Sequence, residues 1–299
     1  MDPLDRGEAL LCFERDRDAA GALAAGLGAA LHIVGRHRFP DGELRLRLPP
    51  ALPPRVIVFA TLDQPNEKLV ELLLVARTAR EFGARELALV APYLCYMRQD
   101  IAFSPGEVVS QRIVGRFLAD LFDRVVTVDP HLHRVATLAQ AVPAQSAIAL
   151  SAAPLIGAFV ATARPGALLL GPDAESRPWV EAAAARGGLE FAVGNKTRHG
   201  DRAVEVALPD VPIAGRDVVL VDDVASTGRT LAQAASQARH AGARRVDAAV
   251  THALFVGDAL QAMRAAGVED IWSSDSIAHP SNRIGLAPLL IEALHNAHG

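Results

Sequence analysis

The stretch Val218–Leu231, which reads VVLVDDVASTGRTL, combines an apolar run, two carboxylates and a segment of small residues. The run Val218–Val221 is typical of a strand that is covered on both faces of a parallel sheet. Asp222 and Asp223 follow it directly, and Ala225–Thr230 then leads into a helical pattern. Ligands of open parallel sheets bind beyond the carboxyl ends of the strands, so this stretch predicts a binding site.

The carboxylates and the loop suit two different parts of one ligand. Backbone N–H groups, the hydroxyls of Ser226 and Thr227 and a helix N-terminus can together hold a phosphate, and Gly228 has no Cβ to obstruct it. Asp222 and Asp223 would repel that phosphate, but they can accept hydrogen bonds from sugar hydroxyls. A pentose 5-phosphate satisfies both parts. The alternative is a capped helix start preceded by two solvated acids.

Length and composition limit the remaining possibilities. The 299 residues suggest two domains, and 51% hydrophobic with 21% charged residues is a globular composition. A net charge of −4 argues against broad attraction to nucleic acid or an anionic membrane, so neither is expected as a partner. The two cysteines, Cys12 and Cys95, fit a reducing compartment. With no secretory signal or membrane span recognisable, the sequence predicts a soluble cytoplasmic protein.

Apolar runs alternate with amphipathic helical patterns along the whole chain, which predicts α/β domains with mainly parallel sheets flanked by helices. An internal echo, EFGARELALVAP and HAGARRVDAAVTH, suggests a duplicated domain, with residues 1–146 and 147–299 as the two domains. The last helix, Ala287–Ala297, is a candidate to pack back on the first domain. The expected strands are Ala9–Phe13, Val56–Thr61, Leu87–Pro92, Arg124–Asp129, Ala147–Leu150, Ala167–Gly171, Asp217–Asp222 and Val246–His252.

The segment Val218–Thr230 resembles the phosphoribosyl-diphosphate binding motif of the type I phosphoribosyltransferase fold. Other segments resemble ribose-phosphate pyrophosphokinase (phosphoribosyl-diphosphate synthetase) in that family's order, over nearly the full chain. The sequence RQDIAFSPGEVVS resembles that of the archaeal-type branch of this family. The resemblance implies two tandem type I phosphoribosyltransferase-like domains: an ATP-side domain, 1–146, and a ribose 5-phosphate-binding domain, 147–299. The segments are His37–Pro49, Ala91–Asp100, Thr127–Arg134, Leu169–Arg177 and Val193–Arg202.

Two of these segments concern ATP. The resemblance implies that Phe39, Asp41 and Glu43 contact adenine across a subunit interface, which makes the protein a homo-oligomer, a dimer or a multiple of dimers. By themselves, Asp41 and Gly42 would indicate a plain turn. The resemblance also assigns the RQD segment to ATP, with an arginine on phosphate oxygens. The residues of this segment are Arg98, Gln99 and Asp100, and a surface ion pair is the alternative for its arginine.

Other segments concern the metal and the chemistry. The resemblance implies that His131 and Asp173 hold the catalytic Mg²⁺, while His133 need not contact it. The His-x-His spacing by itself would suggest a zinc site or two unrelated histidines. Asp173 by itself would suggest a turn. The resemblance implies that Lys196 and Arg198 are the catalytic pair. The alternative is that they belong to a basic surface loop.

The reaction implied is transfer of the β,γ-diphosphoryl group of MgATP to the C1 hydroxyl of ribose 5-phosphate. The products are 5-phosphoribosyl 1-diphosphate, a precursor for nucleotide biosynthesis, and AMP. Two alternatives stay open: a weakly active or regulatory homologue, and a phosphoribosyltransferase. The chain departs from the family at Ile101 and Ala102, where basic residues are usual, and at Arg229. The implied sugar-phosphate site comprises Asp222, Asp223, Ala225, Ser226, Thr227, Gly228, Arg229 and Thr230.

Overall fold

The structure, a computed structural model, describes residues 7–132, 134–199, 203–209 and 211–296, and it describes only the backbone of 195–199 and 203–207. The chain forms two compact units. The first comprises the residues up to Leu150 together with those from Leu286 onward, and the second is Ser151–Gly285. The division follows Leu150 and not residue 146, because strand β8 (Ser146–Leu150) completes the first sheet.

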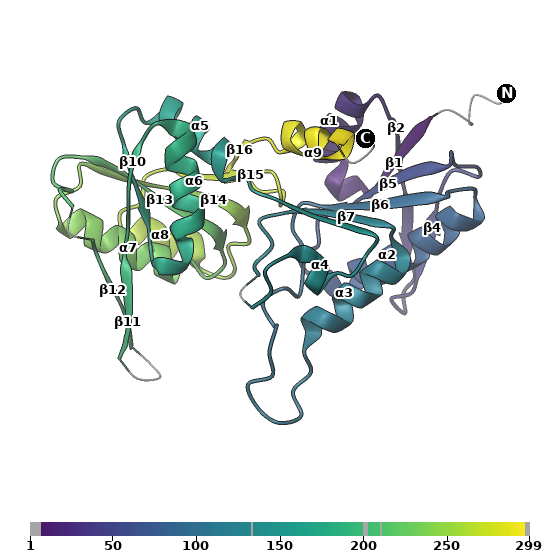
Figure 1. The fold of residues 1–299 in the computed structure, drawn as a ribbon, viewed down its shortest axis with the longest axis horizontal. Helices are drawn as coiled ribbons and strands as arrows, with labels where there is room; N and C mark the ends of the chain where they lie inside the picture. Colours follow the sequence, from purple (N-terminus) through teal and green to yellow (C-terminus); the bar gives the residue numbers. More distant parts are fainter. Residues whose placement is uncertain (1–6, 133, 200–202, 210, 297–299) are drawn as a thin grey trace. The chain divides into compact units, whose positions relative to one another are not determined.

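The first unit contains a six-stranded parallel sheet in the order β2-β1-β5-β6-β7-β8 (Figure 1). Its apolar strands are buried because helices cover both faces. A separate antiparallel hairpin pairs β3 (Gly35–Arg38) with β4 (Leu44–Arg47). The other strands are β1 (Glu8–Cys12), β2 (Ala30–Ile33), β5 (Arg55–Phe59), β6 (Glu86–Ala91) and β7 (Arg124–Val128).

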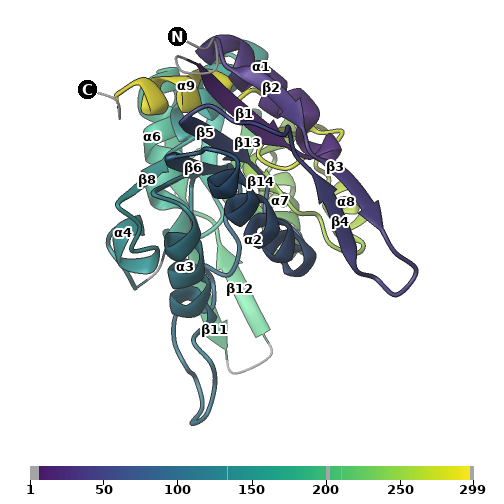
Figure 2. The same ribbon diagram turned by 90° about the vertical axis from the view of Figure 1, so that its right-hand side faces the viewer.

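Helices α2 and α3 cover one face of this sheet, and α1 and α9 lie on the other (Figure 2). The last helix, α9, packs against α1 at Gly26. A Cβ at Gly26 would lie 2.1 Å from Cδ1 of Ile291, so this glycine permits the close approach of the two helices. The helices are α1 (Arg17–Leu27), α2 (Pro65–Glu81), α3 (Ser110–Leu121), α4 (Leu138–Ala141), α9 (Ala287–Asn296) and the 3₁₀ helix η2 (Glu14–Asp16).

The second unit repeats this topology. Its sheet has the order β10-β9-β13-β14-β15-β16, and a hairpin again follows the first pair of strands. Helices α7 and α8 pack on one face, and α5 and α6 on the other. The strands are β9 (Leu168–Gly171), β10 (Glu190–Val193), β11 (Asn195–His199), β12 (Ala203–Ala207), β13 (Asp217–Ala225), β14 (Arg245–Ala253), β15 (Ile271–Ser274) and β16 (Asn282–Ile284). The helices are α5 (Ala153–Ala163), α6 (Arg177–Gly187), α7 (Arg229–His240), α8 (Ala259–Ala265) and η3 (Ala174–Ser176).

The fold class predicted from the sequence is confirmed, but the decisive stretch differs in detail. Strand β13 continues through both aspartates to Ala225, three residues past the expected end at Asp222, because its pairing with β14 continues to Ala225 opposite Ala253. Helix α7 begins at Arg229. Arg229 and Thr230 therefore lie in the first helical turn and not in the loop, which shortens to Ser226–Gly228.

Candidate active site

The carboxylates of the second unit meet where its sheet changes direction. The chain adds β10 on one side of β9 and adds β13 on the other, so the carboxyl ends of β9 and β13 flank a topological switch point. Asp222 and Asp223 lie on β13 at this edge, and Asp173 follows the end of β9. Parallel pairing of Val218–Leu220 with Leu168–Leu170 aligns the two strands.

Charge is concentrated at this edge. The pKa of Asp222 is raised well above its ordinary value, first by burial and then by the neighbouring charges of Asp223 and Asp173. The side chain of Asp223 is buried, and the N–H of Asp223 donates to Oδ1 of Asp222 at 3.0 Å. Three carboxylates in a poorly solvated place favour a bound cation or hydroxyl donors, because either would offset their mutual repulsion.

A buried turn holds Asp173. Its Oδ1 accepts the N–H of Glu175 at 3.1 Å, and its backbone carbonyl accepts the hydroxyl of Ser176 at 2.6 Å. A Cβ at Gly171 would lie 2.3 Å from Oγ of Ser176, so the strand end needs a glycine there. Sequence reasoning missed Ser176, although a serine three residues after an aspartate at a strand end was a usable signal.

The segment Ser226–Gly228 is fixed by residues that follow β14. Gly228 adopts a positive φ of 68°, and a Cβ there would lie 3.2 Å from the carbonyl oxygen of Ala259. The backbone N–H of Phe255 donates to the carbonyl of Ala225, and that of Val256 donates to the carbonyl of Ser226, both at 2.9 Å. These two residues brace the loop from a distant part of the sequence, and no local pattern indicated them.

Lys196 and Arg198 lie on strand β11, which pairs with β12 and places them opposite Val206 and Val204. Strand alternation puts positions 196 and 198 on one face of the hairpin. Their side chains lie outside the described residues. The backbone of this segment forms an antiparallel hairpin, whereas the alternative interpretation of the sequence was a basic surface loop.

The β3–β4 hairpin carries the residues expected at adenine. Phe39 is 37% exposed, its ring meets that of His37 edge-on at 4.9 Å, and the Arg45 guanidinium lies 5.8 Å from its centroid. The N–H of Glu43 donates to Oδ1 of Asp41 at 3.1 Å, which forms the turn at the hairpin tip. The hairpin thus displays an aromatic ring with exposed polar groups around it.

The remaining predicted residues belong to two loops of the first unit. Arg98 is exposed, whereas Gln99 and Asp100 are engaged within the protein. His131 is half-buried after β7, and His133 lies outside the described residues. Asp173, Asp222 and Asp223 are therefore the predicted site residues whose mutual proximity is evident. Among the side chains that the structure describes, no three His, Cys, Asp or Glu residues form a ready metal cluster.

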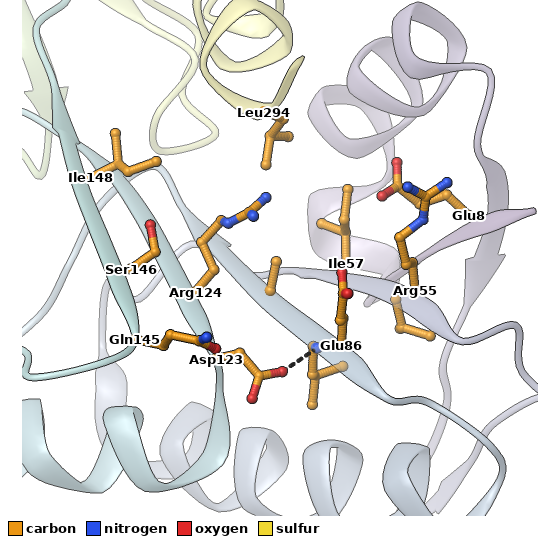
Figure 3. A pocket seen from close by; sticks show the side chains of 13 residues that line it. Glu8, Arg55, Ile57, Glu86, Asp123, Arg124, Gln145, Ser146, Ile148 and Leu294 are labelled. Atoms are coloured by element: carbon orange, nitrogen blue, oxygen red, sulfur yellow. Dashed lines mark hydrogen bonds between the residues drawn. The ribbon is translucent and has the colours of Figure 1, made fainter. Parts of the chain in front are cut away.

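The first unit also contains a pocket of about 390 Å³, which has a different lining (Figure 3). It is lined by residues at the amino ends of the strands, among them Arg55, Glu86 and Arg124, and by Leu294 of α9. Because the amino ends lie opposite the predicted binding edge of the sheet, none of the sequence-predicted site residues lines this pocket.

Comparison with known proteins agrees with this geometry. Residues 9–121 match the family model of the N-terminal domain of ribose phosphate pyrophosphokinase, and residues 160–271 match that of the phosphoribosyl transferase domain. The fold is similar to that of phosphoribosylpyrophosphate synthetase from Mycobacterium smegmatis, with a TM-score of 0.82 and 22% identity over 98% of this chain and 99% of that chain. The class of protein is thus one with two phosphoribosyltransferase-like units.

Curated relatives define the family. The chain is 38% identical to ribose-phosphate pyrophosphokinase of Methanopyrus kandleri over 93% of its own length and 95% of the relative's. It is 34% identical to that of Halobacterium salinarum, over 95% and 100% of the two chains, and 34% identical to that of Thermococcus kodakarensis, over 89% and 93%. The chain belongs to the ribose-phosphate pyrophosphokinase family. These archaeal relatives agree with the archaeal-type resemblance of the sequence. Within the described part of the chain, no helix has the length and apolar character needed to span a membrane.

Proposed function

We propose that the protein is a ribose-phosphate diphosphokinase, which converts ATP and ribose 5-phosphate into 5-phosphoribosyl 1-diphosphate and AMP. The observation that carries this proposal is the meeting of Asp173, Asp222 and Asp223 beside the Ser226–Gly228 loop, in a chain of this family. A carboxylate cluster next to a phosphate-sized loop suits a sugar phosphate, because hydroxyls and phosphate need opposite kinds of partner.

In the proposed reaction, the C1 hydroxyl oxygen forms a bond to the β-phosphorus of ATP. The bond from that phosphorus to the oxygen bridging to the α-phosphate breaks, AMP leaves, and the hydroxyl proton passes to solvent. Asp222 and Asp223 orient the ribose through its hydroxyls, while Ser226–Gly228 and the N-terminus of α7 hold the 5-phosphate. Lys196 and Arg198 stabilise the charge on the transferring group.

The donor set fits a magnesium ion. Mg²⁺ prefers oxygen ligands, keeps several waters, and is usually held by one or two carboxylates together with substrate phosphates. Burial and then the neighbouring acids raise the pKa of Asp222, and a divalent cation would favour its charged form. Asp173 and His131 are the residues we assign to it, with His131 acting directly or through a bound water. The ion would neutralise phosphate charge when bound.

The ATP side of the proposal rests on the first unit. Phe39, Asp41 and Glu43 would reach adenine in a neighbouring subunit, so we propose a homo-oligomer built from dimers. The exposure of Phe39 on a projecting hairpin supports this arrangement. Arg98 is the exposed residue of the RQD segment, and we assign its side chain to the phosphates of ATP. The cytoplasmic location expected from the sequence stays a prediction.

The test is direct incubation of the full chain with MgATP and ribose 5-phosphate. AMP and 5-phosphoribosyl 1-diphosphate should form in equal amounts, and omission of the sugar phosphate should abolish AMP formation. Absence of AMP at saturating substrate would refute the activity. It would then favour a regulatory homologue if both ligands still bind, or a phosphoribosyltransferase if the protein releases diphosphate from phosphoribosyl diphosphate in the presence of a nucleobase.

Substitution of Lys196 tests the assigned chemistry. Lys196→Ala should lower kcat about 10²–10³-fold, because removing one preorganised charge-stabilising group has this effect in other sites. Binding of ribose 5-phosphate should persist. Thr197→Ala is the matched control, since position 197 lies on the opposite face of β11 by strand alternation. Equal rates for Lys196→Ala and the unaltered protein would remove Lys196 from the mechanism.

A further inference from the structure

The loop between β6 and α3 contains the RQD segment but little positive charge. From Arg98 to Val109 it carries one cationic side chain, that of Arg98. Ile101 and Ala102 stand where the family resemblance leads one to expect basic residues. If this loop contacts the triphosphate of ATP, as the proposed function requires, further positive charge has to come from another segment.

Gln99 does not provide a free polar group, because its side chain closes the stem of the loop. Its Nε2 donates to the carbonyl of Ile101 at 3.1 Å, and its Oε1 accepts the N–H of Ser110 at the start of α3. Its backbone carbonyl also accepts the N–H of Gln111 at 3.1 Å. Gln99 therefore holds the two ends of the loop together.

Asp100 is also used within the protein. Its side chain is 1% exposed, and its Oδ1 accepts a hydrogen bond from Nη1 of Arg134 at 2.7 Å. Among the described residues, its Oδ2 has no hydrogen-bond partner. A buried carboxylate is strongly destabilising without a cation, so Asp100 fixes the position of Arg134. So deep a carboxylate is poorly placed to touch ATP itself.

Arg134 brings the missing charge to the loop. It is 51% exposed, and its guanidinium carbon lies 6.0 Å from the centroid of the Phe103 ring, within cation–π range. In the part of the chain that the structure describes, the bond to Asp100 is its one side-chain hydrogen bond. A guanidinium has five N–H donors in a planar fork, so most of them remain available for phosphate oxygens.

We propose that Arg134 binds the phosphates of ATP, and that Asp100 and Phe103 act as positioning residues for its guanidinium. The identity of the ligand rests on the proposed function, while the placement of Arg134 rests on the contacts just described. Arg134 also follows His131 by three residues, so the same ion pair ties the segment assigned to the metal to the RQD loop.

The test compares Arg134→Gln and Arg134→Lys with the unaltered protein. Arg134→Gln should raise KM for ATP at least tenfold and leave KM for ribose 5-phosphate within twofold, and Arg134→Lys should fall between the two. Adding Ala102→Arg to Arg134→Gln should recover part of the loss by supplying a cation from the loop. Arg116→Gln is the matched control, because it removes an exposed ion pair with Asp120 on α3 and should change neither constant.

Asp100→Asn tests the positioning role. It keeps the size of the side chain and removes the charge that holds Arg134, so it should raise KM for ATP by less than Arg134→Gln does. Combining it with Arg134→Gln should add little further loss, since the two residues act through one contact. Fully additive effects of the two substitutions would contradict the coupling.

Calorimetric binding of α,β-methylene ATP with Mg²⁺ separates this inference from the activity. If the unaltered protein forms no AMP, the proposed function fails, while tenfold weaker analogue binding by Arg134→Gln than by Arg116→Gln still supports the inference. Unchanged analogue binding and unchanged KM for ATP in a folded Arg134→Gln protein overturn it. So does failure of the unaltered protein to bind the analogue. If Arg134→Gln does not fold, Arg134→Lys decides by the same measurement.

Discussion

The two units share one strand order but differ at their binding edges. Strand β13 ends in the residues DDVA and is followed by STG, whereas β5 is followed by ATLDQ, which lacks the paired acids. Both helices that follow begin after a residue with positive φ: Gln64 before α2 and Gly228 before α7. The two units therefore share the backbone conformation at this helix start, and their chemistry depends on which side chains stand there.

Internal ion pairs involve the acids that follow β5 and those of α2 in the first unit. Nζ of Lys68 donates to the carbonyl of Thr61 at 2.9 Å and also contacts Asp63. The fully buried Glu71 pairs with Arg15 and Arg36. The carboxylates near the end of β5 are thus balanced by cations of the protein. In the second unit, by contrast, burial and then the neighbouring charges of Asp223 and Asp173 raise the pKa of Asp222. One fold thus pairs acids with cations of the protein in one unit and groups acids with other acids in the other.

The largest expected effect comes from making the second edge resemble the first. The double substitution Asp222→Ala and Asp223→Thr copies Ala60 and Thr61. It should lower kcat/KM for ribose 5-phosphate about 10²–10⁴-fold, because hydrogen bonds to charged groups contribute about 1.5–3 kcal/mol each. Glu181→Gln, an exposed change on α6, is the control. Thermal unfolding should show an unchanged or higher Tm, since repulsion between acids is removed. Retained activity would disconnect these acids from the sugar.

A smaller effect is expected from the buried acid of the first unit. Burial raises the pKa of Asp16 to about 6, against the opposing charges of Arg15 and Lys68. A raised folded-state pKa means that protonation favours folding. The contribution is therefore present in full below about pH 3.8 and is lost as pH rises through about 6, by at most about 3 kcal/mol. Urea unfolding from pH 4 to 7 should show this loss relative to Asp16→Asn. A constant difference between the two proteins would contradict the shift.

The smallest expected effects on stability come from two glycines, one in each unit, at which a helix packs against a backbone carbonyl. A Cβ at Gly115 of α3 would lie 1.8 Å from the carbonyl oxygen of Ala141, and one at Gly157 of α5 would lie 1.9 Å from that of Ala183. Each Gly→Ala change should destabilise its own unit by about 1–3 kcal/mol through overpacking. Hydrogen exchange should increase in the substituted unit alone. Equal increases in both units would mean that they unfold together.

Residue types and local periodicity were enough to predict the fold class and the centre of the candidate site. Continuous apolar runs identify parallel strands because such strands are buried on both faces. Asp222, Asp223 and the STG loop predict a sugar-phosphate site because their opposing preferences are chemical and do not depend on distant contacts. The same local logic misjudged where β13 ends, since a strand ends where its partner stops pairing and not where its apolar run stops.

The sequence by itself determined that this chain has two α/β units and carries the motifs of its family, because both are encoded in neighbouring residues. Tertiary structure decided which of the motif residues are engaged in contacts within the protein. Asp100 meets Arg134 across 34 positions of sequence, and Phe255 braces the loop at Ala225. Such contacts depend on the packing of separate strands and helices. In the RQD segment these contacts bury the side chain of Asp100, which the sequence analysis assigned to ATP. They also place Arg134 beside the loop, and no local pattern had indicated that arginine.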